Sequence, residues 1–419
     1  MLEHCLPQNI RRVLSELPAS LDETYVRILR EIVGYNAPRL LRCLCAAARP
    51  LRVEELADIL TLDFDTERAT PRLVRDWRWD DPELAVLSSC SSLIMVVDTG
   101  HSRVVQFSHF SVKEFLTSDR LATSQGDISR FHITPEAAHT TLTQACLATL
   151  LRLDGSSSNV QIELNFPLAR YASQYWVEHA QFEMVSLHWQ IKHGIQRLFD
   201  PNEPYFSTWL RLYNIDDHWN HFGNAWVARG SPLYYASLCG FRDLAEHIIK
   251  YHRNQVSATG GRRHNPFAAA LHRGHLHVAE LLYQHVASVN ATDYNHQTLL
   301  QVASADGRSD VARWLLDLGA DTNSQRGDLG APIHLATANG HLEVIRTLLN
   351  YGVDINSADN EGRTPLHLAS STGKVEIVRL LLEHGANANS VDNDGYTPLS
   401  LTWTTDVKRL LLDHGANPD

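Results

Sequence analysis

Several features common in membrane, secreted and nucleic-acid-binding proteins are missing from this sequence. Its 419 residues include no apolar run approaching the ~18 residues of a membrane-spanning helix, and no signal peptide stands at the start. No segment carries the excess of basic residues that nucleic-acid binding usually requires, and the net charge is −11. The six cysteines form no C-x-x-C pair and no regular framework, which predicts reduced, buried thiols. We therefore expect a cytoplasmic protein, with the nucleus as the alternative location, that binds neither membrane nor nucleic acid.

Motifs on which catalysis depends are also absent. The sequence contains no G-x-S-x-G, which would present a nucleophilic serine, and no H-E-x-x-H, which would bind zinc. It has no Cys/His spacing typical of a zinc site. Scattered Ser, His and Asp residues cannot be assembled into a triad from sequence alone. We expect no enzyme activity, no catalytic residue, no cofactor and no metal.

The C-terminal half contains a repeat. Residues 360–369 read NEGRTPLHLA, and the position of Thr364 recurs at a spacing of 33 or, once, 34 residues. The equivalent positions are Ser231, Asn265, Thr298, Ala331 and Thr397. A period of about 33 headed by Thr-Pro-Leu-His-x-Ala is the signature of the ankyrin repeat, a pair of helices that stacks on its neighbours.

Three features recur in phase with this pattern. The Thr364-type residue can cap the first helix, and the proline after it suits the first helical turn. A glycine nine residues later fits the turn between the helices, and another, such as Gly385, fits the left-handed end of the second helix. The sixth repeat is about three residues short, since Gly415 follows Thr397 early. The ankyrin region is predicted to span 229–419, with repeats at about 231–264, 265–297, 298–330, 331–363, 364–396 and 397–419.

Helices are predicted in the first part of the chain. A capping box at Ser20 to Glu23 opens an amphipathic run, a second helix follows Pro38, and a third starts at Val53. The polar stretch 61–82 is expected to be a loop, with Trp77 and Trp79 as its anchors.

A hairpin and a further helix complete this part. Two β-rich runs, 93–97 and 103–107, flank a short turn that contains glycine, which predicts the hairpin. A capping box at Ser111 to Glu114 predicts the start of the helix that follows. Three helices and a hairpin in this order describe a winged helix, which we place at 1–125 with its preceding helices.

Residues 126–228 are predicted to form a helical connector. Thr134-Pro135-Glu136 is a strong helix start. The region is rich in tryptophan, and we expect these side chains to pack between helices: Trp176, Trp189, Trp209, Trp219 and Trp226. The whole chain is therefore predicted to be mostly α, with a winged-helix domain, a helical connector and an ankyrin α-solenoid of about six repeats.

The first 225 residues resemble the region that follows the nucleotide-binding module in fungal NACHT–ankyrin proteins of the NOD-like receptor type. The resemblance rests on four stretches: LPASLDETY at 17–25, ARPL at 48–51, FSHFSVKEFL at 107–116 and YASQYW at 171–176. The winged helix is also similar to that of the GPI inositol-deacylase winged-helix family, a likeness that implies no deacylase activity. The resemblance to NACHT–ankyrin proteins implies a NACHT-type ATPase as a partner, in the same chain or in another.

The nucleotide-binding module itself is not in this sequence. A phosphate-binding loop needs G-x-x-x-x-G-K-[ST], but Gly373-Lys374 lacks the first glycine and is followed by Val375. In the wider receptor family, the histidine matching His109 contacts the nucleotide. Without the module, His109 is kept only as a relic of a nucleotide sensor, and hydrogen bonding to nearby backbone is the favoured role.

The 23 histidines raise the question of a metal site. His272, His275 and His277 lie close together in the sequence. Many of the others fall where the ankyrin pattern itself favours histidine: His275, His334, His341, His367, His384 and His414. Structural roles in the repeats are therefore favoured over metal binding.

A winged helix could bind DNA, which is the alternative class of function, as a transcription-associated regulator with an ankyrin interaction module. Such binding needs a basic recognition helix and wing. The helix starting at Val53 is acidic, and the wing offers little more than His101 and Arg103.

We expect the function to be protein–protein interaction. Ankyrin hairpin tips and first helices form an extended concave surface that suits protein partners. By the repeat register, the partner-binding side chains are Tyr294, His296, Arg326, Asn360, Glu361, Arg363, Asn393, Asp394 and Tyr396. Tyr294, Arg326 and Tyr396 are the best candidates for hot spots, because aromatic residues and arginine dominate such sites. The expected role is that of a non-enzymatic scaffold, as the sensor half of a NOD-like signalling or innate-immunity receptor.

Overall fold

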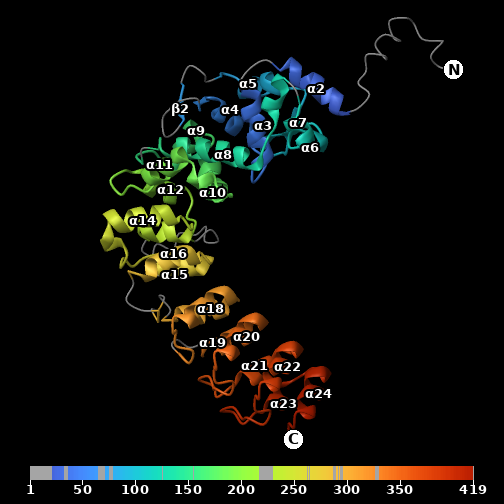
Figure 1. Cartoon of the computed structure of the whole chain (residues 1–419), viewed down its shortest axis with the longest axis vertical. Coiled ribbons are helices and arrows are strands. Elements are labelled where there is room, and N and C mark those ends of the chain that lie inside the picture. The colour runs from blue at the N-terminus through green and yellow to red at the C-terminus, as the bar shows by residue number, and fades with distance from the viewer. Residues whose placement is uncertain are drawn as a thin grey trace, which may run out of the picture. The chain divides into compact units, whose positions relative to one another are not determined.

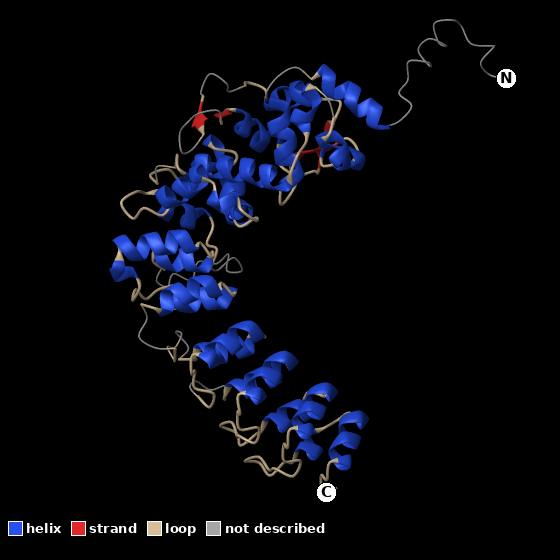
Figure 2. Ribbon diagram, viewed as in Figure 1, coloured by secondary structure: helices blue, strands red, loops and turns tan. Residues whose placement is uncertain are grey.

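The protein is described by a computed structural model. It covers residues 21–32, 36–64, 71–74, 79–124, 126–153, 155–216, 230–261, 263, 265–285, 289–290, 292, 296–325 and 330–418. The chain divides into two compact units, Met1–His218 and Trp219–Asp419. Most of the described residues lie in helices (Figures 1 and 2). Within the described ranges, no helix is both long enough and apolar enough to span a bilayer.

The elements of the first unit are mainly short helices with two small hairpins (Figure 1). In order they are α2 (Leu21–Glu31), α3 (Asn36–Ala46), α4 (Val53–Leu60), β1 (Leu62–Asp63), β2 (Arg72–Leu73), α5 (Pro82–Cys90), β3 (Ile94–Asp98), β4 (Arg103–Phe107), α6 (Phe110–Leu116), α7 (Asp119–Ala122), η2 (Asp127–Phe131), α8 (Pro135–Leu150), α9 (Asn159–Asn165), α10 (Ala169–Ala180), η3 (Val185–Leu187), α11 (Trp189–Leu198) and α12 (Tyr205–Leu212).

The winged helix is built from α3, α4, α5 and the antiparallel hairpin β3–β4. The three helices pack on one another, and Val96 pairs with Val105 in the hairpin. A bridge between Arg52 and Val104 adds a third, very short strand, in which the Val105 N–H donates to the Leu51 carbonyl at 2.9 Å. The predicted fold is therefore correct in its outline.

One winged-helix element, α5, was not predicted. Asp81 caps it by accepting hydrogen bonds from the N–H groups of Glu83 and Leu84, and Pro82 occupies its first turn. The stretch predicted as a loop at 61–82 in fact contains β1 and β2, which pair with each other. Trp79 is 48% exposed, while Trp77 lies outside the described residues. The local sequence signal for α5 is Asp81-Pro82-Glu83, a capping residue followed by proline and an acidic residue in the first turn.

The three helix starts predicted at Ser111, Ser20 and Thr134 have different outcomes. Helix α6 begins at Phe110, and its cap is His109 rather than Ser111, because the His109 ring accepts the hydrogen bond from the Ser111 N–H. The capping box predicted at Ser20 lies outside the described residues. At α8, the predicted start is confirmed, since the Thr134 hydroxyl accepts from the Ala137 N–H.

The helices after η2 share a core with the winged helix. Helix α8 packs against α3 on one side and α10 on the other. Trp176 and Trp209 are fully buried with ring centroids 5.3 Å apart, as expected of packing residues. Trp189 is exposed, which contradicts the expectation for it, while Trp219 and Trp226 lie outside the described residues.

The second unit is a stack of helix pairs, which Figure 1 shows following one another in sequence order. The pairs are α13 (Pro232–Leu238) and α14 (Arg242–Tyr251), α15 (Pro266–Arg273) and α16 (Leu276–Tyr283), α17 (Leu299–Ala305) and α18 (Ser309–Asp317), α19 (Pro332–Asn339) and α20 (Leu342–Asn350), α21 (Pro365–Ser371) and α22 (Val375–Glu383), and α23 (Pro398–Leu401) and α24 (Thr405–Asp413); the 3₁₀ turn η4 (Arg253–Gln255) follows α14.

The local signals of the ankyrin repeat act as predicted. Side chains of Ser231, Asn265, Thr298 and Thr397 accept hydrogen bonds at the starts of their helices. The glycines of the inter-helix turns have positive φ in the five repeats that possess one. In the short sixth repeat this glycine is missing, and α23 has only 4 residues.

Candidate partner-binding surface

Each hairpin tip in the fourth and fifth repeats is shaped by an aspartate. The Asp359 carboxylate accepts from the N–H groups of Glu361 and Arg363 at 3.0 and 2.8 Å. One repeat later, Asp392 accepts from the N–H groups of Asp394 and Tyr396 at the same two distances, 3.0 and 2.8 Å. An aspartate that binds its own downstream backbone fixes a tight turn. The two tips therefore have the same conformation and present equivalent side chains.

Neighbouring tips are joined to each other through Asn393. Its backbone N–H donates to the Glu361 carbonyl and its side-chain amide donates to the Asn360 carbonyl, both at 3.1 Å. Gly362 makes this approach possible, because a Cβ there would lie 2.5 Å from Asn393 Oδ1 and 2.8 Å from its backbone nitrogen. The tips of adjacent repeats form a continuous edge.

Comparing Gly362→Ala with Gly395→Ala tests this contact. Both glycines occupy the same place in their tips, with φ of +77° and +87°, but nothing lies within 4 Å of a Cβ at Gly395. We expect Gly395→Ala to destabilise the array by about 1–2 kcal/mol through left-handed backbone strain alone. Gly362→Ala should cost about 2–4 kcal/mol, because the clash with Asn393 adds to that strain. Hydrogen exchange of the fourth and fifth repeats in denaturant would measure both, and equal costs would contradict the proposed contact.

The structure brings most of the predicted partner-binding residues to these tips. Asn360, Glu361, Asn393, Asp394 and Tyr396 are exposed there. Arg363 is half-buried and paired with Asp359 and Glu361 at 3.0 and 2.7 Å, so its charge is already matched within its own tip.

The remaining three predicted residues belong to earlier repeats in the sequence. His296 is exposed and has a φ of 61°, which few side chains other than glycine, asparagine and aspartate adopt. Tyr294 and Arg326 lie outside the described residues.

An exposed aromatic side chain in the last repeat, Trp403, was not among the residues predicted from the sequence. It is 77% exposed, and its indole N–H donates to the Ser371 carbonyl of the preceding repeat at 3.2 Å. Its ring lies 3.4 Å from the position of a Cβ on Gly373, so the neighbouring turn supports one side of it. Trp403 stands where the sixth repeat loses three residues, and that shortened turn was the signal that could have identified it.

Two histidines beneath the tips act as structural residues. His367 is buried, its Nδ1 accepts from the Thr364 N–H at 3.1 Å, and its Nε2–H donates to the Tyr396 carbonyl at 3.1 Å. His334 likewise donates to the Ser357 and Arg363 carbonyls at 3.0 and 3.2 Å. Burial lowers the pKa of both imidazoles, and hydrogen bonds to carbonyls oppose this only in part. Both rings are therefore neutral near pH 7.

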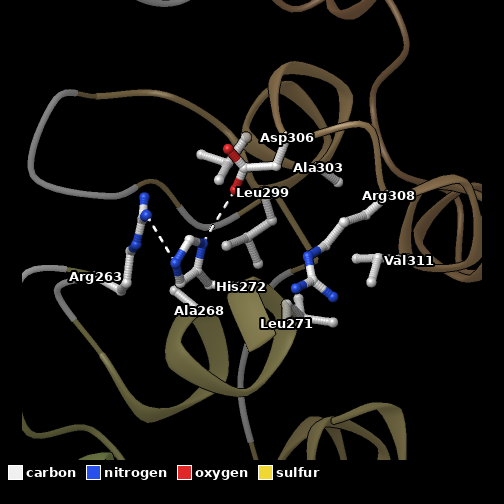
Figure 3. Close-up of a pocket in the computed structure, with 10 residues that line it drawn as sticks. Arg263, Ala268, Leu271, His272, Leu299, Ala303, Asp306, Arg308 and Val311 are labelled. Carbon is white, nitrogen blue, oxygen red and sulfur yellow. Dashed lines mark hydrogen bonds and ion pairs between the residues drawn. The ribbon is translucent and has the colours of Figure 1, made fainter. Parts of the chain in front are cut away.

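A small hollow lies between the first helices of the second and third repeats (Figure 3). Arg263 donates to His272 Nε2 at 2.9 Å, and His272 Nδ1–H donates to Asp306 at 3.0 Å. Burial would raise the pKa of the Asp306 carboxyl, but the hydrogen bond from His272 and the charges of Arg263 and Arg308 lower it overall. The free volume is about 10 Å³, which is enough for one water molecule or a methyl group. The hollow could receive the tip of a partner's side chain but not a cofactor.

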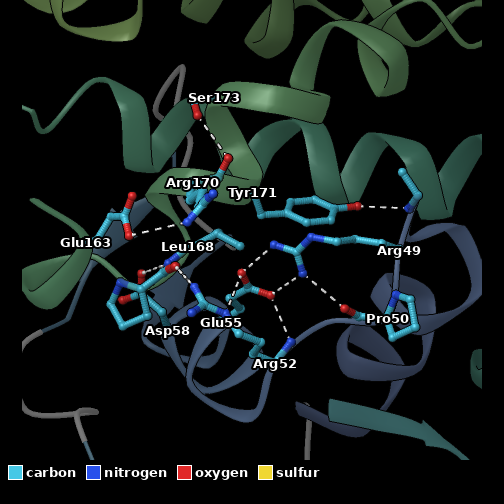
Figure 4. Close-up of polar contacts among 12 residues, drawn as sticks. Arg49, Pro50, Arg52, Glu55, Asp58, Glu163, Leu168, Arg170, Tyr171 and Ser173 are labelled. Atoms are coloured by element: carbon cyan, nitrogen blue, oxygen red, sulfur yellow. Dashed lines mark hydrogen bonds and ion pairs between the residues drawn. The ribbon is translucent and has the colours of Figure 1, made fainter. Parts of the chain in front are cut away.

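Among the described residues of the first unit, the most deeply buried charge belongs to Glu55 of α4 (Figure 4). Arg49 donates to its two oxygens at 2.8 and 2.6 Å, and the Arg52 backbone N–H donates at 2.8 Å. Burial would raise the pKa of the Glu55 carboxyl, but these hydrogen bonds and the charges of Arg49 and Arg52 hold it below its usual value. Both oxygens are occupied, so the carboxylate is not available as a general acid or base.

The same cluster ties the winged helix to α10. Tyr171 accepts from the Ala48 N–H at 3.1 Å and its ring lies under the Arg49 guanidinium at 5.0 Å. Arg52 donates to the Pro167 carbonyl at 3.3 Å. We conclude that this cluster holds the unit together.

His109, the possible nucleotide-sensor position, is exposed and bonded locally. Its Nδ1 lies 2.6 Å from the Ser111 hydroxyl and 3.2 Å from the Ser111 N–H. This is the local backbone role favoured by the sequence analysis.

The helix that precedes the wing is α5, not the helix at Val53 that we compared with a recognition helix. Helix α5 reads PELAVLSSC and contains no lysine or arginine, and its Glu83 pairs with Arg103 of the wing. Helix α5 itself therefore offers no positive charge to DNA. In the described residues, moreover, no group of three or more His, Cys, Asp or Glu side chains could hold a metal ion.

Comparisons with known proteins agree with this architecture. A family model described as ankyrin repeats in three copies matches residues 230–326 and 332–419. Another, described as the winged helix domain of GPI inositol-deacylase, matches residues 28–129. The C-terminal region thus consists of ankyrin repeats, and the N-terminal region contains a winged-helix domain.

A curated relative is the azaphilone pigments biosynthesis cluster protein L of Monascus ruber. It is 33% identical to this chain over 324 residues, which cover 74% of this chain and 61% of that protein. The chain therefore spans less than two thirds of the length of this relative.

Proposed function

We propose that the protein is a non-enzymatic scaffold whose ankyrin repeats bind a protein partner on the surface formed by the hairpin tips and first helices. The observation that carries the proposal is the continuous edge built by the two tips at Asn360 and Asn393. Rigid turns present exposed polar and aromatic side chains at a regular interval along it. Such a surface binds another protein with little ordering cost.

The first unit would then act as a docking domain. The resemblance to NACHT–ankyrin proteins supports a role as the sensor half of a NOD-like signalling or innate-immunity receptor, working with a NACHT-type ATPase in the same chain or in another. The relative's name connects that protein with pigment biosynthesis, and a regulatory scaffold could serve in such a setting as well.

Site-directed photo-crosslinking in the full chain tests the proposed surface. A benzoylphenylalanine at Ala338, exposed on the first helix α19, would probe it, and one at Arg346, exposed on the second helix α20 of the same repeat, is the matched control. We expect discrete crosslinked proteins from cells that express the chain at Ala338 and none at Arg346. Crosslinks only at Arg346, or at neither position, would contradict the proposal.

A further inference from the structure

The chemistry of the tips and of Trp403 indicates what kind of segment the surface can bind. In the fourth and fifth tips, residues 351–363 and 384–396 contain five acidic side chains and one basic one, Arg363. That arginine is already paired with Asp359 and Glu361. The Glu361 side chain is nevertheless 68% exposed, and Asp394 is exposed as well. The edge therefore carries a net negative charge that its own residues leave unmatched.

Two aromatic side chains flank the first helix of the last repeat. Tyr396, 52% exposed, lies two residues before α23, and Trp403, 77% exposed, lies two residues after it. The Tyr396 backbone is held by Asp392 and His367, and the Trp403 indole is held by the Ser371 carbonyl. The Trp403 ring, fixed by its indole and largely exposed to solvent, is suited to stacking on a planar cation.

We infer that repeats four to six bind an extended, arginine-rich peptide segment of a partner, with one guanidinium stacked on Trp403 and others paired with Glu361 and Asp394. Arginine fits better than lysine, because its planar guanidinium stacks on an aromatic face while its N–H groups still donate to carboxylates. A partner segment that is acidic, or that alternates basic and acidic residues, would place negative charges against the negatively charged tips. The inference rests on the proposed function and names the partner's chemical class.

Binding of synthetic peptides to the full chain tests it. The probe is a fluorescein-labelled peptide of alternating arginine and serine, and its counterparts replace arginine by lysine or by glutamate. Fluorescence anisotropy at moderate salt is expected to show binding of the arginine peptide, weaker binding of the lysine peptide and none of the glutamate peptide. Equal binding of the arginine and lysine peptides, or binding of the glutamate peptide, would overturn the inference.

Variants at exposed positions then distinguish binding at the proposed surface from non-specific attraction of a basic peptide to an acidic protein. Trp403→Leu keeps apolar area but removes the ring, and we expect the Kd of the arginine peptide to rise about three- to tenfold, with Trp403→Phe recovering part of the loss. The double variant Glu361→Gln with Asp394→Asn should raise the Kd of the arginine peptide by a similar factor.

The matched control is the pair Glu343→Gln and Glu376→Gln on the second helices α20 and α22. Their side chains are 75% and 74% exposed, and the pair removes the same charge. It should change the Kd less than about twofold. An equal effect of the two pairs, or no effect of Trp403→Leu, would overturn the inference. If crosslinking at Ala338 succeeds while the arginine peptide fails to bind, the scaffold function stands and only the partner's class is wrong.

Discussion

Arg49→Leu is expected to destabilise the first unit by about 3–5 kcal/mol, because it leaves the buried carboxylate of Glu55 without its main partner. Arg49 supplies the hydrogen bonds to both Glu55 oxygens, at 2.8 and 2.6 Å, and Arg52 can replace only part of them. The loss should reach α10 as well as α4, since the same guanidinium lies over the ring of Tyr171. Hydrogen exchange of peptides from α4 and α10 in the full chain, measured against urea, would give the change in unfolding free energy.

Two further variants make this result specific. Arg49→Leu combined with Glu55→Leu removes both charges, and we expect it to recover a large part of the lost stability. Arg346→Leu removes the arginine of an exposed pair, Arg346–Glu343 at 3.6 Å, and should cost less than about 1 kcal/mol. A loss of under about 1 kcal/mol for Arg49→Leu would show that Glu55 tolerates burial without this partner.

His367→Ala is expected to destabilise the ankyrin array by about 3–5 kcal/mol, whereas His367→Gln should cost less than about 1 kcal/mol. The third repeat supplies the reason, because Gln301 occupies the position that His367 holds in the fifth. Gln301 accepts from the Thr298 N–H at 2.8 Å and donates to the Gly330 carbonyl at 2.8 Å. Glutamine can therefore make both of the hydrogen bonds that the histidine makes, and alanine can make neither.

The two side chains differ in their response to acid. The pKa of His367 is lowered by burial, so the unfolded chain takes up a proton more readily than the folded one. The stability that neutral His367 provides is complete above the unfolded pKa of about 6.5 and is lost as the pH falls through the folded value. As the pH falls below about 6.5, we therefore expect the unfolding free energy to fall more steeply in the original chain than in His367→Gln.

Both comparisons can be made in one experiment. The chain is equilibrated in urea at each pH, and a brief exchange pulse at a single fixed pH then labels the unfolded repeats. Parallel pH dependences of the original chain and His367→Gln would exclude titration of His367. A cost of His367→Gln close to that of His367→Ala would exclude the shared role with Gln301.

Much of the fold could be predicted because the signals that specify it are local. The residues at Thr364 and its equivalents, the prolines after them and the turn glycines each act within a few residues of themselves. Their recurrence at a fixed period identified the ankyrin repeats, and two β-rich runs around a short turn that contains glycine identified the hairpin of the winged helix. Helix α5 was missed for a local reason too, since its cap at Asp81 lies in a stretch dominated by polar residues.

The sequence by itself determined the phase of the repeats, the ends of most helices and the positions of the hairpin tips. Only the tertiary structure decided what those positions do. It assigned the Asn393 amide to a neighbouring tip, held the Trp403 indole on the preceding repeat, buried Glu55 between two arginines and brought α10 against Arg49. Each of these contacts joins residues from separate elements, and the free energy of such a contact depends on burial and geometry that no local pattern encodes.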